Sequence, residues 1–335
     1  MTALVTGATG FIGSAVARRL LARGESVRVL ARAGGDRRNL AGLDVEIIEG
    51  DLRDPAARDT AVRGIDSLYH VAADYRLWVP NPAEMYATNV EATSALLRAA
   101  ATAGATRLVY TSSVATLGIP TDGSLATEDT PVLLADMVGP YKRSKYMAEE
   151  AVRALVREEK LPVVIVNPTA PVGPRDVKPT PTGRTVIEAA AGRMPAFVDT
   201  GLNLAHVDDI AEGHLLAHDN GVIGERYILG GENLSLQQIL QRIAALTGGK
   251  AATIKVPHGL ILPIAYAAEF AARAFRTGEP FVTVDGIKLA RKRMFFTHAK
   301  AERDLGYTAR PVDEALTDAI TWFRAHGALP PRCRR

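Results

Sequence analysis

Three glycines near the start of the chain, Gly7, Gly10 and Gly13, place the strongest constraint on how it folds. An apolar run typical of a buried strand, residues 3–5, precedes them, and a helical pattern over residues 11–21 follows. In such a strand–turn–helix unit the first glycine permits the tight turn, and the second lets a pyrophosphate approach bare backbone. The third lets the helix pack closely on the strand. The unit therefore predicts a dinucleotide site; a glycine-rich turn without a ligand is the alternative.

The start of the following helix would complete this site. Its first N–H groups have no partner within the helix, and the positive end of the helix dipole favours phosphate oxygens. The residues that we expect to contact the cofactor in this unit are Gly7, Thr9, Gly10, Phe11, Ile12 and Gly13.

Strand and helix patterns alternate without interruption to about residue 167, which predicts an α/β fold with a Rossmann-type, doubly wound parallel sheet. Beyond that point, proline- and glycine-rich pieces alternate irregularly with short strands and helices. This change predicts a smaller C-terminal substrate-binding lobe over the carboxyl edge of the sheet. Further strands are expected at residues 26–30, 45–49, 65–71, 107–111 and 161–166, and long helices at 83–103 and 139–159.

These patterns predict two domains and a tail. Residues 1–170 would form the NAD(P)-binding domain, to which segments of about residues 200–230 return. Residues 171–328 would form mainly the substrate-binding lobe, and residues 329–335 a basic tail.

Charge and cysteine content exclude several classes of function. The 40 Lys and Arg residues are interspersed among 37 acidic ones, so the net charge of +3 gives no footprint for nucleic acid. The single cysteine, Cys333, excludes an intrachain disulfide and favours a reducing, cytoplasmic location. The tail is expected to be a solvated end, with weak contact to an anionic surface as the alternative.

No apolar run reaches the roughly eighteen residues that a membrane span needs, and the strand expected at residue 3 leaves no room for a signal peptide. The nearest candidate for a span, residues 260–275, is interrupted by Pro263, Glu269 and Arg273. We expect an amphipathic helix or the wall of a substrate pocket there. A helix lying on a membrane surface is the alternative.

The end of the second strand indicates which cofactor binds. An acidic residue there would bind the ribose 2′-hydroxyl of NAD, whereas an arginine favours the 2′-phosphate of NADP. This chain has Ala31 and Arg32 at that place, with Arg37 and Arg38 nearby. Arginine pairs well with phosphate, so NADP(H) is favoured over NAD(H). A solvated basic loop is the alternative.

Other strand ends contribute further candidates. Asp51 and Leu52 suit the edge and face of an adenine, although Asp51 could equally be the N-cap of the helix that begins near residue 55. Ala72 and Ala73 leave room for a cofactor. His70 is expected to be a strand residue satisfied by its neighbours, because no second ligand lies at metal-site spacing, and no metal is expected.

The loop over residues 74–82 contains several large side chains, including Tyr75 and Trp78. Such a loop often forms the wall of a pocket, although either ring could simply fill a gap in the core.

Tyr141 and Lys145 lie four residues apart on an expected helix, so their side chains share one face. A nearby ammonium would lower the pKa of the phenol and suit it to general acid–base work, and the same lysine could bind a ribose hydroxyl. Ser113 follows the strand at residues 107–111, at the sheet edge where such folds carry out their chemistry. It could hold the oxygen of a substrate while a hydride moves.

These motifs together resemble those of the extended short-chain dehydrogenases/reductases over about residues 2–328. Within that superfamily the chain resembles the dihydroflavonol-4-reductase-like group and the bacterial hopanoid-associated sugar epimerases. The resemblance implies that Ser113, Tyr141 and Lys145 are catalytic, that Asn89 orders the active-site helix, and that Pro168 packs on a nicotinamide. The stretches that carry it are residues 6–13, 50–52, 70–78, 112–113, 141–145 and 206–209.

Two departures favour a reductase over a nucleotide-sugar epimerase. Epimerases of this superfamily usually end the second strand in Asp, where this chain has Ala31, and usually carry Asn where it has Ala170. The methyl group of Ala170 cannot donate a hydrogen bond to a diphosphate oxygen.

We therefore expect an NADP(H)-dependent oxidoreductase that reduces a carbonyl or oxidises a secondary alcohol on a bulky, partly apolar small molecule. A hopanoid side chain is one candidate. The apolar residues of the lobe, among them Phe281, Phe295 and Phe296, suggest such a substrate, unless they only form the core of the lobe. The alternatives are a sugar epimerase or dehydratase with the same site and a non-catalytic cofactor-sensing scaffold. Either a monomer or a homodimer fits.

Overall fold

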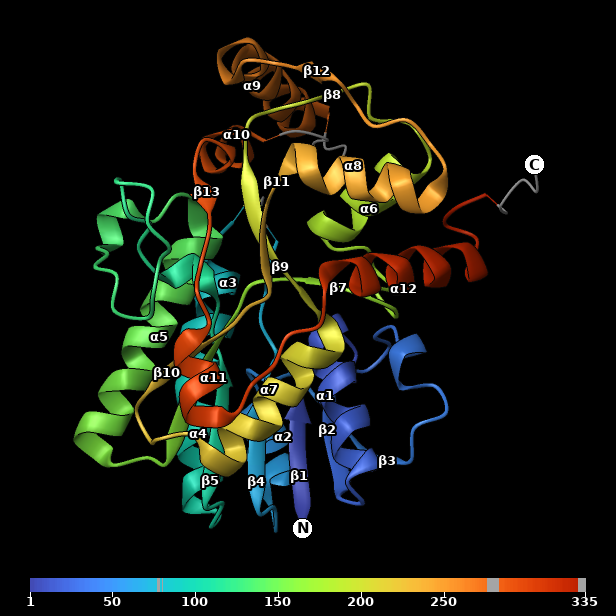
Figure 1. The fold of residues 1–335 in the computed structure, drawn as a ribbon. Coiled ribbons are helices and arrows are strands. Elements are labelled where there is room, and N and C mark those ends of the chain that lie inside the picture. Colours follow the sequence, from blue (N-terminus) through green and yellow to red (C-terminus); the bar gives the residue numbers. More distant parts are fainter. Residues whose placement is uncertain (77–78, 80, 276–282, 331–335) are drawn as a thin grey trace.

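Runs of buried aliphatic residues form a parallel sheet at the centre of the molecule (Figure 1). The computed structural model describes residues 1–76, 79, 81–275 and 283–330, and in these residues the sheet has seven strands in the order β3-β2-β1-β4-β5-β6-β10. Every neighbouring pair is parallel, so the predicted α/β fold with a doubly wound sheet is confirmed. The strands are β1 (Thr2–Thr6), β2 (Ser26–Ala31), β3 (Val45–Glu49), β4 (Ser67–His70), β5 (Arg107–Thr111), β6 (Val163–Pro168) and β10 (Arg226–Leu229).

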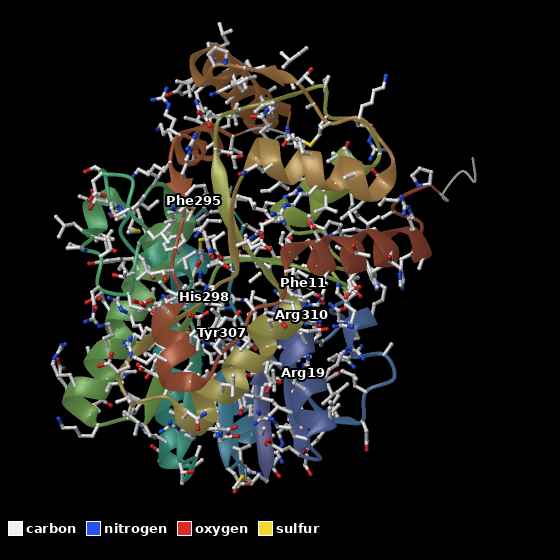
Figure 2. All side chains as sticks on the ribbon, viewed as in Figure 1. Phe11, Arg19, Phe295, His298, Tyr307 and Arg310 are labelled. Atoms are coloured by element: carbon white, nitrogen blue, oxygen red, sulfur yellow. The ribbon has the colours of Figure 1, made fainter. Side chains whose placement is uncertain are left out.

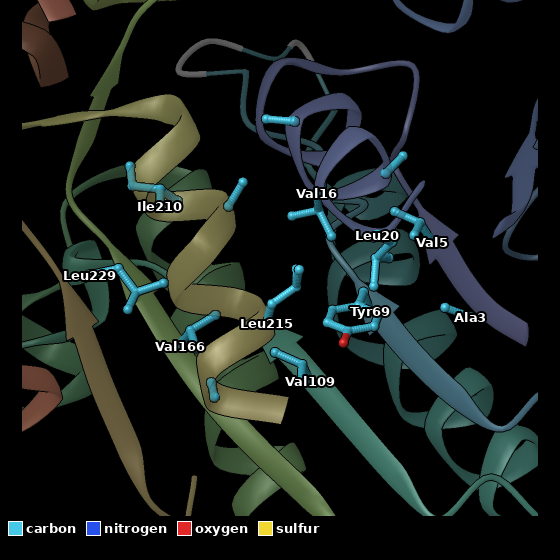
Figure 3. Close-up of a cluster of buried hydrophobic side chains, with 14 of the residues drawn as sticks. Ala3, Val5, Val16, Leu20, Tyr69, Val109, Val166, Ile210, Leu215 and Leu229 are labelled. Carbon is cyan, nitrogen blue, oxygen red and sulfur yellow. The ribbon is translucent and has the colours of Figure 1, made fainter. Parts of the chain in front are cut away.

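Alternate side chains of these strands bury opposite faces of the sheet, as a period of two residues requires. On one face, Val5 and the side chains of the other strands that point the same way pack against three helices (Figure 3). These are α1 (Phe11–Ala22), α7 (Val207–Asn220) and α11 (Ala299–Leu305). On the other, Leu4 and its counterparts pack against the remaining helices of the sheet. These are α2 (Pro55–Val62), α4 (Thr93–Thr102) and α5 (Gly139–Glu159).

The helix expected over residues 83–103 is interrupted. Its first turn, α3 (Ala83–Tyr86), leads into a π-helical segment, η2 (Ala87–Ala92), and then into α4. π-helical turns are rare in proteins as a whole, and those that occur often lie at functional sites. This one contains Asn89, whose buried side-chain amide forms hydrogen bonds with the loop after β4 and with α5.

β6 begins two residues later than its apolar pattern predicts. Lys160 ends α5 in the left-handed conformation with φ of 57°, so the chain is still turning at residues 160–162. The strand then continues through Asn167 to Pro168, which brings both residues to the carboxyl edge of the sheet.

A smaller lobe lies over that edge (Figure 1). Its centre is β9 (Gly201–His206), which pairs with β7 (Ala170–Val172), β11 (Glu232–Ser235) and β13 (Arg293–Met294). α6 (Pro181–Ala190), α8 (Leu236–Thr247) and α12 (Val312–Ala325) enclose its core. The domain boundaries near residues 170 and 328 stay predictions.

The far tip of the lobe is formed by α9 (His258–Phe275) and α10 (Val284–Ala290) (Figure 1). The other short elements are η1 (Arg38–Leu40), η3 (Val114–Thr116), η4 (Leu134–Asp136), β8 (Ala196–Phe197) and β12 (Ile254–Lys255). Expectations for Leu77, Trp78, Phe281, Cys333 and the tail beyond residue 330 fall outside the described residues. Within the described residues, no helix is both long and apolar enough to cross a membrane.

Leu20 offers a test of the packing between α1 and α7. Its side chain is fully buried in the cluster of Figure 3, so Leu20→Ala should lower the free energy of unfolding by about 2–5 kcal/mol. Ile223→Ala is the control, because that side chain is 47% exposed and its loss should cost no more than about 0.5 kcal/mol. Urea unfolding followed by circular dichroism measures both. Equal costs for the two variants would contradict this packing.

Candidate active site

The turn between β1 and α1 leaves no room for side chains at two of its glycines. Gly7 has a φ of +73°, and a Cβ there would lie 2.7 Å from the backbone nitrogen of Ala72. A Cβ on Gly13 would lie 2.2 Å from the carbonyl oxygen of Gly7. Gly10 is exposed and precedes α1 without a side-chain cap, so the first N–H groups of the helix stay available. This cradle fits the phosphates of a dinucleotide.

Neighbouring residues hold the turn in place. Phe11, labelled in Figure 2, and Ile12 lie at the start of α1 and pack against the buried cluster beneath it. The carbonyl oxygen of Thr9 accepts a hydrogen bond of 3.2 Å from the side-chain amide of Asn39 in η1. The loop after β2 is thereby tied to the turn.

His70 is satisfied by two threonines, as predicted. Its Nδ1 lies 2.7 Å from the hydroxyl of Thr6, and its Nε2 lies 2.8 Å from the hydroxyl of Thr93. Burial lowers the pKa of His70 to about 3, with a further contribution from the charge of Lys145, so the ring is neutral. Across the described chain, no three His, Cys, Asp or Glu side chains are grouped so as to hold a metal ion.

Ala72 and Ala73 follow β4 and are half-buried beside the turn. The Ala72 N–H donates a hydrogen bond of 3.3 Å to the Thr6 hydroxyl. The backbone of Ala72 lies against Gly7, so this exit borders the cradle.

Arg32 differs from the arginines that follow it. Arg37 is paired with Glu49, and Arg38 with Asp36 at 2.6 Å. The side chain of Arg32 is exposed and makes no hydrogen bond or ion pair with any residue that the structure describes. Its charge acts on two nearby carboxylates, Asp51 and Asp74, at the carboxyl ends of β3 and β4. A free guanidinium at this edge fits a phosphate.

Asp51 does not cap the helix after β3, which was the alternative role for it. Asp54 is the N-cap of α2 and accepts a hydrogen bond of 3.0 Å from Ala56 N–H. Asp51 instead pairs with Arg53, whose hydrogen bond is the main cause of the lowered pKa of Asp51. Leu52 is buried in the sheet's second cluster, which leaves Asp51 as the polar group at this strand end.

Ser113 and Tyr141 meet at the carboxyl edge of β5. Ser113 precedes η3 and caps it, accepting a hydrogen bond of 3.1 Å from Ala115 N–H. Tyr141 lies in the first turn of α5, and its phenol is close enough to the Ser113 hydroxyl for that hydroxyl to lower the pKa of the phenol. The structure therefore places two of the three residues predicted to be catalytic beside each other.

The pKa of Tyr141 differs from the expectation. Burial raises it above its ordinary value, and the hydrogen bond with Ser113 only partly opposes this rise. The lysine one helical turn away was expected to lower it, but Lys145 is directed elsewhere. Tyr141 is therefore a neutral phenol that carries its proton at physiological pH.

Lys145 is buried against β5. Its Nζ donates a hydrogen bond of 2.8 Å to the Thr111 carbonyl and one of 3.3 Å to the Tyr110 hydroxyl, and it lies 4.9 Å from the centre of the Tyr110 ring. Burial lowers the pKa of Lys145 to about 8, although Glu149 opposes the shift. The ammonium is thus tied to the strand that carries Ser113.

Two further residues implied by the resemblance lie beside this group. Asn89 donates a hydrogen bond of 3.0 Å to Ser144 on α5 and bonds the backbone of Asp74 through both ends of its amide. It therefore joins the π-helical turn, the loop after β4 and the active-site helix. Pro168 is the buried last residue of β6, opposite Leu229 of β10.

A buried carboxylate on α5 was missed by the sequence analysis. Glu149 is 2% exposed, and its carboxylate accepts hydrogen bonds from Ser112, Thr116 at 2.9 Å and Asn167 at 2.8 Å. Its other oxygen is paired with Arg226 at 2.8 Å. Four elements, η3, α5, β6 and β10, and Ser112, the residue after β5, therefore converge on one charge behind Ser113.

One signal in the sequence could have indicated this residue. Glu149 lies four residues after Lys145, on the helix face that otherwise buries Ala148 and Val152. An acid on a buried face needs donors, and the amide of Asn167, which also donates to the Ser113 carbonyl at 3.0 Å, supplies one.

Lys142 also lies beside Tyr141, and it has no acidic partner among the described residues. Burial, and secondarily the charge of Lys292, lowers its pKa to about 8.

The aromatic residues of the lobe belong to its packing. Phe296 is buried with Val114, Leu117 and Ala126 directly behind the Ser113 turn, and the ring of Phe295 covers Gly201. Figure 2 shows Phe295 in the lobe, above His298, as the chain descends toward the sheet. Phe296 therefore forms core rather than the wall of a free pocket, whereas Phe295 is half-buried.

Comparison with known proteins agrees with this geometry. Residues 3–230 match the model of the NAD dependent epimerase/dehydratase family. The chain is 42% identical over 327 residues to a Synechocystis protein named "Putative dihydroflavonol 4-reductase", covering 96% of this chain and 94% of that one. It is 37% identical over 330 residues to sterol demethylase protein B of Methylococcus capsulatus, covering 98% and 100%.

A solved structure resembles the whole fold. The crystal structure of gox2253 is 51% identical in sequence and superposes with a TM-score of 0.88, covering 98% of this chain and 99% of that one. The similarity extends over the sheet and the smaller lobe alike.

Glu149 allows a test with a matched control. Glu149→Gln removes one partner of a buried ion pair and should lower the free energy of unfolding by about 3–5 kcal/mol. The adjacent Glu150 is exposed and pairs only with Arg153, so Glu150→Gln should cost about 0.5 kcal/mol or less. Urea unfolding at neutral pH measures both. A Glu149 variant as stable as its control would show that this network does not hold the strand ends together.

Proposed function

Because the chain belongs to the NAD dependent epimerase/dehydratase family, within the extended short-chain dehydrogenases/reductases, we propose that it is an NADP(H)-dependent carbonyl reductase. Its substrate would be a bulky, partly apolar small molecule, in a cytoplasmic setting. The same site could oxidise the corresponding secondary alcohol.

The placement of Ser113 beside Tyr141 carries this proposal. A carbonyl that becomes an alcohol must receive a proton at its oxygen. Tyr141 holds one, because burial raises the pKa of its phenol. The Ser113 hydroxyl lies beside that phenol, so a carbonyl oxygen placed between them would accept a hydrogen bond from each hydroxyl.

Other residues would bind and orient the cofactor. The turn with Gly7, Gly10 and Gly13 would hold the pyrophosphate, and Arg32 the 2′-phosphate, while Pro168 would support the nicotinamide. When bound, reduced nicotinamide supplies a hydride. Lys145 would hold the Ser113 strand through Thr111 and could reach a ribose hydroxyl beside Tyr141.

Three observations favour reduction over epimerisation of a nucleotide sugar. One full-length relative carries a reductase name. Ala170, at the start of β7, offers no amide to a diphosphate, and Ala31 ends β2 without a carboxylate for a ribose 2′-hydroxyl. The family as a whole includes epimerases, which keeps an epimerase or dehydratase as the alternative.

Arg32→Ala tests the choice of cofactor. Loss of a charge-assisted bond to phosphate should weaken NADPH binding by about tenfold and leave NADH binding unchanged. Arg38→Ala removes an equally exposed arginine that is already paired with Asp36, and it should bind NADPH like the parent. Titration calorimetry measures all three proteins. Equal weakening of NADPH and NADH by Arg32→Ala would exclude a role for Arg32 in recognising the 2′-phosphate.

Tyr141→Phe tests the chemistry. NADPH oxidation with a panel of ketones, including a dihydroflavonol and a sterol ketone, should fall at least about 100-fold in kcat, while NADPH affinity stays within about twofold. Tyr146→Phe, one residue beyond Lys145 on the same helix, is the control and should keep full activity.

Two results would contradict this reading. Unchanged turnover of Tyr141→Phe would remove Tyr141 from the chemistry. Inversion of a sugar-nucleotide carbon without net consumption of NADPH would favour the epimerase alternative.

A further inference from the structure

We propose that the outer face of α9 docks on the surface of an anionic phospholipid bilayer. This inference concerns the tip of the smaller lobe and does not depend on the reaction proposed above.

The outer face of α9 is apolar over the side chains that the structure describes. Of the side chains described in this helix, the exposed ones are Gly259, Leu260, Pro263, Tyr266, Ala267 and Phe270, and we call these six residues the outer stripe. At 3.6 residues per turn they fall within about one third of the helix circumference. A helix on the surface of a globular protein normally turns charged or polar residues to solvent, and the outer stripe contains no charged residue.

The opposite face of α9 is already used. Ala265 and Ala272 are buried there, and Ile261 and Leu262 pack against Val284 and Ile287 of α10. Glu269 also lies on this inner face and accepts a hydrogen bond of 2.7 Å from Val284 N–H. The outer stripe is therefore additional to the face that the fold buries.

The exposure of the outer stripe is large. Leu260, Tyr266 and Phe270 are 66%, 56% and 75% exposed. Single exposed apolar residues are common on protein surfaces, but several that are contiguous mark a site for a partner or a membrane.

Positive charge borders the start of the outer stripe. His258 bonds the carbonyl oxygen of Ala290 at 3.1 Å, so the first turn of α9 lies beside the segment that follows α10. That segment contributes three cations and β12 a fourth. We call this set of exposed residues the basic edge: Lys255, Arg291, Lys292 and Arg293.

The basic edge is not neutralised by the described chain. Asp199 pairs with both Lys255 and Arg293, which leaves Arg291 and Lys292 without an acidic partner among the residues that the structure describes. An apolar surface bordered by unpaired cations matches a bilayer with anionic headgroups, because side chains enter the acyl boundary while the cations meet the phosphates.

A second copy of this chain complements the surface less well. An isologous contact would present the same outer stripe and the same basic edge, and neither offers a carboxylate to Arg291 or Lys292. The position of α9 also suits a membrane. It lies at the tip of the lobe, far from the amino-terminal edge of the sheet where the chain begins (Figure 1).

Vesicle flotation with the full chain tests the proposal. The parent protein should float with phosphatidylcholine vesicles that contain about one third phosphatidylglycerol, and partition at least about tenfold less into phosphatidylcholine alone. The triple variant L260S/Y266S/F270S should lower partitioning into the anionic vesicles by about tenfold or more. The variant R291E/K292E should lower it similarly, and about 0.5 M salt should weaken binding of the parent.

V222S/I223S is the matched control. Both side chains are exposed apolar residues that precede β10, away from α9, and this variant should float like the parent. All substitutions lie at exposed positions, so thermal melting should show folded proteins. Should the triple variant fail to fold, R291E/K292E still tests the proposal.

Three outcomes would overturn it. The parent could fail to bind anionic vesicles, or the triple variant could bind them as well as the parent. Light scattering could also show that the parent is a dimer and that the triple variant is a monomer, with no change in vesicle binding. That result would make the outer stripe an interface between two copies of the chain. None of these measurements uses the cofactor or a substrate, so their failure is distinct from failure of the reductase assignment.

Discussion

The structure depends on a backbone contact in which three segments meet without side chains between them. Gly7 ends β1 with its Cα against Ala72, and Gly13 presses α1 onto the Gly7 carbonyl. Any Cβ at either glycine would lie under 3 Å from backbone atoms, which cannot move aside as a flexible side chain could. The contact therefore sets where α1 starts, where β4 ends and how close a ligand comes to the peptide groups between them.

The reactive half of the site depends on a different interaction, a charge buried behind it. A buried ion pair adds little net stability, because the cost of removing two charges from water offsets their attraction. What Glu149 adds is a fixed arrangement of the segments around it. Hydrogen bonds from Ser112, Thr116 and Asn167 meet its carboxylate together with Arg226, so the ends of β5, β6 and β10 are held in one arrangement relative to α5. Tyr141 lies on α5 and Ser113 follows β5, so the same arrangement places the two residues beside each other.

The sheet and the glycine turn were predictable from the sequence because both leave local signals. Apolar runs bounded by turns predict buried strands, and glycine spacing predicts a close approach of backbone. The pairing of Ser113 with Tyr141 followed from placing motifs at the strand ends. The pKa of Tyr141 did not follow, because it depends on where Lys145 points. Spacing along a helix places both residues on one face, but only the tertiary structure shows that Thr111 and Tyr110 attract the ammonium.

The smaller lobe shows why exposure is harder to predict than secondary structure. The apolar content of residues 260–275 predicts a helix equally well whether one face or two faces are apolar, and only the position of α10 decides which face is covered. Because α10 packs on Ala265 and its neighbours, Leu260, Tyr266 and Phe270 are left outside. The same reasoning separates Phe296 from these residues. Phe296 lies next to Phe295 in the sequence and has equal hydrophobicity, yet it is 1% exposed, because the chain returns from the lobe to the sheet there and inserts it behind the Ser113 turn.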